Sequence, residues 1–390
     1  MDARPSPISS KGRRGRGAEK EVPSLAADAL RIAIVAPPWY PLPPRGYGGT
    51  ELVVHLLHTE LRRMGHEVTV FGANGSGAGV TTLADASWNR DLGYAYETAR
   101  LGTYLARVFD QLAGSRFDVL HDHSGFAGTL LALHSGVAPV VVHTIHGELL
   151  DPFCAFYQEI QDRVRLCGIS ESQAATAPGI RLAAVVPNAV EIPSTPPTRA
   201  RERYLIEVAR ITPDKGQHLA IEVARRAGRK LILAGKVERT GEGERYFEDQ
   251  IEPHLGRTVE YYPNVAGAEK ARLISRAAAG IFPLQWPEPF GLAMVECMVV
   301  GTPVLALRSG STPELIDHGV TGFLAEDVDE LVTAATHLDQ IDPVRCAEVA
   351  RERFSPRRMA ERYLEVYRQS AAVGEASPSP AARTPLSSGR

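Results

Sequence analysis

The chain has 390 residues, of which 44% are hydrophobic and 23% are charged, and its net charge at pH 7 is −3. This composition is typical of a soluble protein with a substantial core, and the length allows two or more domains. The lack of a basic excess argues against a nucleic-acid partner, and no apolar run approaches the ~18 residues of a membrane span.

The two ends of the chain are predicted to be disordered tails. Residues 1–29 and 371–390 are rich in small, polar and proline residues and lack apolar periodicity. The pair Arg13-Arg14 resembles a twin-arginine signal, but the next segment, GAEKEVPSL, is charged where such a signal needs an apolar stretch. The four cysteines lack CxxC spacing, which favours reduced thiols and a cytoplasmic location.

Short apolar segments alternate with helical segments through the first half of the chain. RIAIVA (31–36) and HEVTVFG (66–72) are predicted strands, and TELVVHLLHTELRRMG between them has helical spacing. DVLH, PVVVH and LCGIS continue the rhythm as further strands. This alternation indicates a parallel sheet covered by helices on both faces, and we assign residues 30–190 to it.

The pattern restarts after a proline-rich stretch, residues 191–202, which we interpret as a linker. Residues 203–355 again alternate between predicted strands (RYLIEVAR, KLILAG, RTVEYY, GIFPL, PVLAL, GFLA) and helical segments. The expected fold class is therefore α/β, with two Rossmann-like, doubly wound domains that face a central cleft. Ligands of such sheets bind at the carboxyl ends of the strands.

The stretch WPEPFGLAMVECMVVGTP (286–303) places two carboxylates unusually. We expect a helix to begin near Phe290-Gly291, so that Glu288 lies ahead of it and Glu296 inside it. The free N–H groups of a helix start bind phosphate, and the two carboxylates on either side can accept hydrogen bonds from hydroxyls. A nucleotide-sugar, with its ribose, diphosphate and hexose, has that arrangement. From the residues alone, a solvated Glu288 and a Glu296 paired with a basic neighbour explain the stretch equally well.

These motifs together resemble the retaining glycosyltransferases of family 4, which have the GT-B architecture. The likeness runs from about Arg31 to Gln369 and is strongest from WPEPFGLAMVEC to GVTGFL, which is similar to the family's donor site. VARITPDKGQHLAIEVA, PRGYGGTELVVHLL and VVPNAVE resemble its phosphate-binding segment, its glycine loop and the junction before its linker. The run ECMVV departs from the family's smaller residues. The resemblance also implies that the amphipathic segment 356–370 crosses back onto the first domain.

The resemblance implies roles for residues at other strand ends. Arg210 and Lys215 flank the turn ITPDK and would stabilise a leaving diphosphate; without the resemblance, ion pairing with Asp214 is the favoured explanation. His146, in HTIHG, would contact the donor sugar, with a histidine bonded only to backbone as the alternative.

The glycine loop GYGGT and the loop YPNVAGAEK complete the predicted donor site. Gly48 and Gly49 would let backbone N–H groups approach the donor, although an ordinary glycine turn fits equally well. The backbone near Val265 would contact the nucleotide base, or the segment is an ordinary loop. The predicted catalytic residues are His146, Arg210, Lys215 and Glu288, and the predicted donor-binding residues are Gly48, Gly49, Arg210, Lys215, Val265, Glu288, Phe290, Gly291, Leu292 and Glu296.

We expect no metal ion and no cofactor. The histidines of LHDH and HTIHG would point in directions unsuited to one ion. Asp327 in DVD has capping-box spacing with Glu330, so it is predicted to cap a helix and not to hold a metal.

The predicted activity is transfer of a hexose from a nucleotide-sugar, with UDP preferred, to an acceptor hydroxyl with retention of configuration. The alternatives are a nucleotide-sugar epimerase of the same architecture, a nucleotide-sugar-binding protein without turnover, and a Rossmann-type redox protein. The expected partners are the nucleotide-sugar and an unidentified acceptor. Nothing in the sequence supports peripheral membrane contact.

Overall fold

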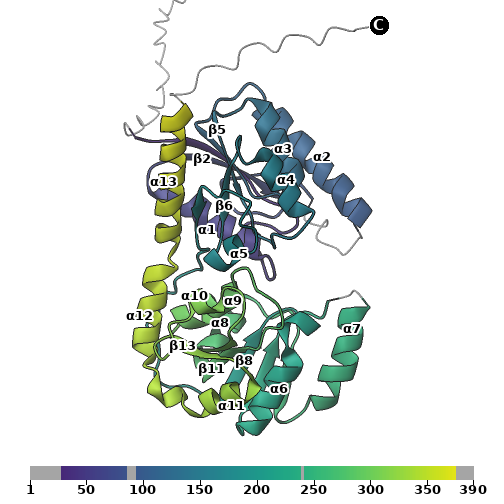
Figure 1. Ribbon diagram of the computed structural model, residues 1–390, viewed down its shortest axis with the longest axis vertical. Coiled ribbons are helices and arrows are strands. Elements are labelled where there is room, and N and C mark those ends of the chain that lie inside the picture. Colours follow the sequence, from purple (N-terminus) through teal and green to yellow (C-terminus); the bar gives the residue numbers. More distant parts are fainter. Residues whose placement is uncertain (1–27, 86–93, 239–240, 375–390) are drawn as a thin grey trace, which may run out of the picture.

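The computed structural model describes residues 28–85, 94–238 and 241–374 and contains two α/β domains, one above the other in Figure 1. Each domain is built on a parallel sheet whose two faces are both covered. Along one strand of the first sheet, Ile32 and Ile34 join one core cluster while Ala33 and Val35 join another. Successive side chains of a strand point to opposite faces, so an apolar run such as RIAIV is buried on both sides.

The first sheet has the strand order β3-β2-β1-β4-β5-β6-β7, and every pair is parallel. Its strands are β1 Arg31–Val35, β2 Glu67–Ala73, β3 Val80–Ala84, β4 Val119–Asp122, β5 Val140–Thr144, β6 Arg165–Gly168 and β7 Ala184–Val185. Its helices are α1 Gly49–Arg63, α2 Tyr94–Leu112, α3 Phe126–Ser135, α4 Phe153–Ile160 and α5 Glu171–Ala175.

The second sheet has the order β10-β9-β8-β11-β12-β13 and is also parallel. Its strands are β8 Tyr204–Val208, β9 Lys230–Ala234, β10 Val259–Tyr262, β11 Ala279–Phe282, β12 Val304–Leu307 and β13 Gly322–Ala325. Its helices are α6 Gln217–Arg226, α7 Glu242–Tyr246, α8 Gly267–Arg276, α9 Leu292–Val299, α10 Thr312–Leu315, α11 Val328–Thr336 and α12 Pro343–Arg353. The strand order reverses between β1 and β4 and between β8 and β11, and ligands of such sheets bind at these switch points.

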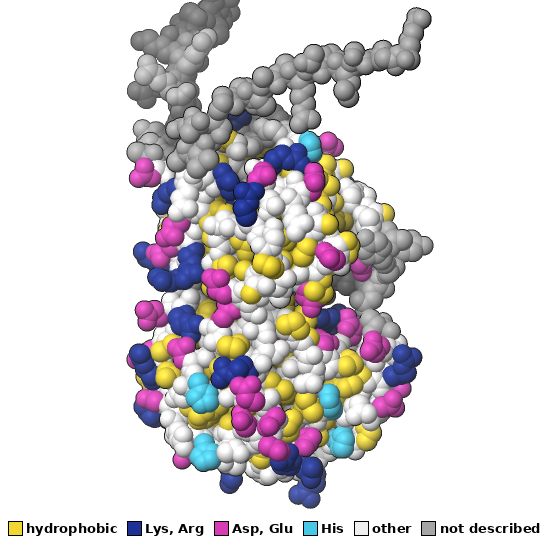
Figure 2. Space-filling view, in the orientation of Figure 1, with side chains coloured by type: hydrophobic (Ala, Val, Ile, Leu, Met, Phe, Trp, Pro, Cys, Tyr) yellow, Lys and Arg dark blue, Asp and Glu magenta, His cyan; other side chains and the backbone are white. Residues whose placement is uncertain are grey.

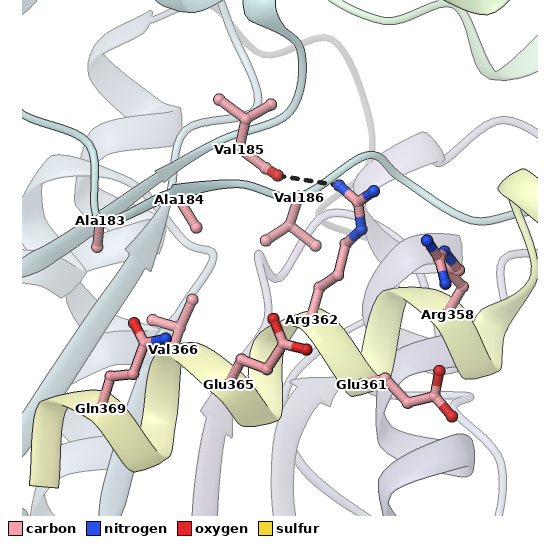
Figure 3. Close-up of a pocket in the computed structure, with 10 residues that line it drawn as sticks. All are labelled: Ala183, Ala184, Val185, Val186, Arg358, Glu361, Arg362, Glu365, Val366 and Gln369. Atoms are coloured by element: carbon pink, nitrogen blue, oxygen red, sulfur yellow. Dashed lines mark hydrogen bonds between the residues drawn. The ribbon is translucent and has the colours of Figure 1, made fainter.

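The last helix, α13 (Pro356–Gly374), runs from the second domain back along the first (Figure 1). Met359, Tyr363, Leu364 and Tyr367 are buried in the core that α1 and β1 also share. Figure 3 shows the opposite side of α13 beside β7, where Arg362 donates a hydrogen bond to the Val185 carbonyl at 3.4 Å. The helix therefore joins the first domain although it follows the second in sequence.

The structure confirms the α/β fold class and differs from the sequence predictions in three places. Strands β3 and β7 were not predicted, because VTTLA is only partly buried and AV is only two residues long. The tail predicted for 371–390 is wrong at its start, since α13 continues to Gly374. The rest of that tail and residues 1–27 lie outside the described residues. None of the helices in the described ranges is both long enough and apolar enough to cross a membrane.

Candidate functional site

A cavity of about 930 Å³ lies between the two domains. Its walls come from the loops that follow β1, β4, β5, β8, β9 and β11, which are the carboxyl ends of strands in both sheets. Every residue predicted for the site lines this cavity, from Gly48 and His146 in the first domain to Glu296 in the second. The residues are thus brought together; their roles remain predictions.

The starts of helices α1 and α9 lie next to each other at the wall of the cavity. Gly291 has a φ of 93° and precedes α9, and Gly48 has a φ of 144° and precedes α1. Residues other than glycine rarely adopt these φ values. A Cβ atom on Gly49 would lie 3.0 Å from Leu292 Cδ1, so the two starts are in close contact. Their N–H groups and helix dipoles favour an anion at this point.

Glu288 lies just ahead of α9 and is paired with Lys215. The Lys215 Nζ lies 2.5 Å from Glu288 Oε2 and 3.7 Å from Asp214 Oδ2. It also lies 4.2 Å from the centre of the Trp286 ring, a cation–π contact. The Glu288 side chain is only 19% exposed, so the alternative of a solvated Glu288 is wrong. Lys215, in turn, pairs more closely with Glu288 than with Asp214.

Glu296 lies inside α9 and accepts two hydrogen bonds from Lys270 Nζ, at 2.7 and 2.9 Å. Pairing with a basic neighbour was the alternative left open by the sequence, and the structure contains this pair. Glu296 and Glu288 both line the cavity. A carboxylate that accepts hydrogen bonds from one lysine keeps further lone pairs, so both glutamates can still accept hydrogen bonds from ligand hydroxyls.

The turn that carries Arg210 and Lys215 is held by a buried glutamine. Gln217 Nε2 donates to the Arg210 carbonyl at 3.0 Å and to Glu207 Oε1 at 2.9 Å. Arg210 itself pairs with Glu238 at 2.8 Å and not with Asp214. Its side chain is about one-third exposed and lines the cavity.

The histidines at the ends of β4 and β5 bond to side chains. His146 Nε2 lies 2.8 Å from His123 Nδ1, so the alternative of a histidine bonded only to backbone is wrong. Burial and the neighbouring His143 lower the pKa of His146 to about 3, against the opposing effect of Asp122. His146 is therefore neutral at physiological pH and acts as a hydrogen-bonding group, not as a cation.

The predicted role of Asp327 is confirmed, since its side chain caps α11 by accepting from the Glu330 N–H at 2.9 Å. The described residues contain no group of three or more His, Cys, Asp or Glu side chains arranged to hold a metal.

Several cavity residues were not predicted from the sequence. Lys270 and Glu238 are separated from their partners by 26 and 28 positions, so no local spacing indicated them. Trp286 is the first residue of the motif WPEPFGLAMVEC, so its position in the motif was a sequence signal for a cavity residue. The aromatic residues Phe126 and Phe153 also line the cavity and carried no motif.

Glu51, in the first turn of α1, is a buried carboxyl whose titration affects stability. Burial raises its pKa from 4.5 to about 7, although hydrogen bonds from the backbone N–H groups of Glu51 and Tyr40 oppose this shift. The native protein thus holds a proton that the unfolded chain releases above pH 4.5. The protonated Glu51 therefore contributes its full stabilisation of the folded state below pH 4.5, and this contribution is lost as the pH rises to about 7.

We expect Glu51→Gln, which mimics the protonated form, to remove this pH dependence. The free energy of unfolding of the wild type should fall relative to the variant by about 3 kcal/mol between pH 4.5 and pH 8. Urea unfolding at both pH values measures the difference. Glu365→Gln, at an exposed position of α13, is the control. A constant gap between wild type and Glu51→Gln would contradict the prediction.

Comparison with known proteins identifies relatives of both halves. The sequence profile described as Glycosyltransferase Family 4 matches residues 47–191, and the profile of Glycosyl transferases group 1 matches residues 191–352. A glycogen synthase of Mycobacterium tuberculosis is 27% identical over 90% of this chain and 97% of its own length. A GDP-Man:Man(3)GlcNAc(2)-PP-Dol α-1,2-mannosyltransferase of Xenopus laevis is 32% identical, but the match spans only 36% of this chain and 32% of that protein.

Solved structures share the two-domain arrangement. AviGT4, a glycosyltransferase involved in avilamycin A biosynthesis, has a TM-score of 0.66 and 26% identity, with 88% of this chain and 98% of that chain covered. The sucrose-phosphate synthase of Thermosynechococcus elongatus has a TM-score of 0.72 and 19% identity, with 88% and 100% covered.

Proposed function

Because the chain belongs to the family 4-like glycosyltransferases of GT-B architecture, we propose that it transfers a hexose from a UDP-sugar to an acceptor hydroxyl with retention of configuration. UDP is the donor nucleotide that the family resemblance favours. The observation that carries the proposal is the pair of lysine–glutamate contacts on either side of the α9 start, next to the α1 start.

The diphosphate binds at the α9 start in this proposal. Lys215 and Arg210 are the cations beside it, and charge-assisted hydrogen bonds of this kind contribute roughly 1.5–3 kcal/mol each. The leaving diphosphate gains negative charge as the bond to the sugar breaks, so these contacts strengthen in the transition state. The helix starts of α1 and α9 add fixed positive potential without needing to reorganise.

The two glutamates bind opposite ends of the donor. Glu296, on the Lys270 side, accepts hydrogen bonds from the ribose hydroxyls, and Glu288 accepts from hydroxyls of the transferred hexose. Val265 lies at the nucleotide end of the cavity and contacts the base. Neutral His146 contacts the hexose from the first domain. An oxygen of the leaving phosphate takes the proton of the acceptor hydroxyl as the new bond forms on the same face.

The proposal is tested by product analysis with UDP-, GDP- and ADP-sugars in extracts of the source organism, with and without excess chelator. We expect mass spectrometry to find a new glycoside from a UDP-sugar in both conditions, and NMR to find the anomeric configuration of the donor. Free epimer without glycoside would indicate the epimerase, and bound but intact donor would indicate a binding protein. Loss of transfer in chelator with recovery in Mn²⁺ would overturn the metal-independent mechanism.

A further inference from the structure

The two domains contribute different side chains to the cavity. The second domain contributes the cations Arg210, Lys215, Lys236 and Lys270. The first domain contributes three neighbouring rings, Phe126, Phe153 and Tyr157, which we term the aromatic wall. It also contributes Arg45, Glu51 and Glu148. The proposed donor diphosphate lies beside the cations of the second domain, which leaves the aromatic wall for the acceptor.

The rings of the aromatic wall pack against one another, and two of them are partly exposed. The rings of Phe126 and Phe153 are stacked, with centres 5.2 Å apart and an angle of 28° between them, and Phe126 lies 5.5 Å from Tyr157. Phe126 is 37% exposed and Phe153 is 40% exposed, which is unusual for phenylalanine. Figure 2 shows hydrophobic side chains scattered over the visible face of both domains.

Two exposed leucines lie close to the wall residues along the chain. Leu130 follows Phe126 by one helical turn on α3, and Leu150 precedes Phe153; they are 41% and 53% exposed. Exposed apolar side chains beside a cavity are typical of a binding surface.

A chain of hydrogen bonds gives the wall one oriented polar atom. Asp122 Oδ2 lies 2.8 Å from His143 Nδ1, and His143 Nε2 lies 3.2 Å from the Tyr157 hydroxyl. The carboxylate holds the proton on Nδ1, so Nε2 accepts the bond from the Tyr157 O–H. The phenol oxygen keeps a lone pair, which can accept a hydrogen bond from a ligand hydroxyl.

Charge disfavours a phosphorylated occupant beside the aromatic wall. Neither α3 nor the segment 147–160 contains Lys or Arg, and the segment contains the carboxylates Glu148, Asp151 and Glu159. A phosphate group, whether on a sugar or on a lipid headgroup, would meet negative charge from these carboxylates, and α3 and the segment 147–160 supply no Lys or Arg to pair with it.

We propose that the acceptor is an uncharged molecule with a flat apolar body, stacked on Phe126 and Phe153, whose hydroxyl is oriented by Tyr157. This rests on the proposed function for the donor site, and it specifies the chemistry of the second substrate. Flat rings gain dispersion and edge or face contacts from the stacked pair.

The test is equilibrium binding without donor, by calorimetry or ligand-observed NMR. The probes are 4-methylumbelliferone, maltotriose and glucose 6-phosphate. We expect the wild type to bind 4-methylumbelliferone at least tenfold more tightly than either sugar. Phe126→Ala should weaken that binding about tenfold, and Phe153→Ala provides a second variant should the first fail to fold. Tyr157→Phe should weaken it less. Leu131→Ala is the matched control, since Leu131 is equally exposed on α3 but does not line the cavity.

Three outcomes would overturn the proposal. Tighter binding of maltotriose or glucose 6-phosphate would show a polar acceptor site, and equal effects of Phe126→Ala and Leu131→Ala would place the probe elsewhere. Sedimentation of the wild type, but not of Phe126→Ala, with phosphatidylcholine–phosphatidylglycerol vesicles would show a lipid surface. A parallel titration with UDP separates the hypotheses. A protein that binds UDP but does not bind 4-methylumbelliferone refutes only the acceptor inference, whereas failure to bind UDP refutes the proposed donor.

Discussion

Glu288→Gln is expected to lower kcat by a factor of ~10²–10³ while UDP affinity stays within about threefold of the wild type or increases. Glu288 is assigned to the transferred hexose, and contacts near the reacting carbon hold the sugar in its reactive position. UDP lacks that hexose, so it loses no contact. Removal of the carboxylate also frees Lys215, which lies 2.5 Å away, to interact with the diphosphate.

Glu296→Gln is the matched comparison, because it removes one charge from the other lysine-paired glutamate of the same cavity. Its assigned contact, with the ribose, is remote from the breaking bond, and such contacts serve ground state and transition state alike. UDP affinity should fall about tenfold and KM should rise, with kcat within a few-fold of the wild type. Isothermal titration with UDP beside steady-state kinetics measures both variants. The opposite pattern would exchange the two assignments, and two unaffected variants would refute the proposed donor site.

The residues that we propose for the donor site could be predicted to lie together because their signals are local. Gly291, Glu288 and the start of α9 lie within one short stretch, and glycine before a helix start is explained by its positive φ. The helix then determines where Glu296 lies in space relative to the start of α9. The fold class followed in the same way, since apolar strands such as β1 and β8 bury both faces and alternate with helices.

The partners of the site residues could not be predicted because they depend on tertiary packing. Lys270 reaches Glu296 from α8, and the Lys215–Glu288 pair joins two loops 73 positions apart. The aromatic wall has the same origin: Phe126 begins α3 and Phe153 begins α4, and only the packing of those helices stacks their rings. Apolar residues in helices usually indicate core, so their exposure carried no sequence signal.

Lys215→Met is expected to lower kcat/KM by ~10²–10³ and to weaken UDP binding at least tenfold. Lys215 is 8% exposed and packs on Trp286, so methionine keeps the apolar stem in place while removing the charge. The substitution has two consequences. The diphosphate loses a charge-assisted hydrogen bond, and the carboxylates of Glu288 and Asp214 remain beside it without their cation.

A double-mutant cycle separates those two consequences. The variant Lys215→Met/Glu288→Gln removes the cation together with its closest carboxylate, so its UDP affinity should recover several-fold relative to Lys215→Met alone. Its kcat should not recover, because Glu288 is absent from the hexose. Arg226→Met is the control, since Arg226 pairs with Glu222 and Asp329 outside the cavity and its loss should leave both measurements unchanged. Strictly additive effects on UDP affinity would show that Glu288 and Lys215 act independently, and an unchanged UDP affinity of Lys215→Met would place the diphosphate away from the Lys215–Glu288 pair.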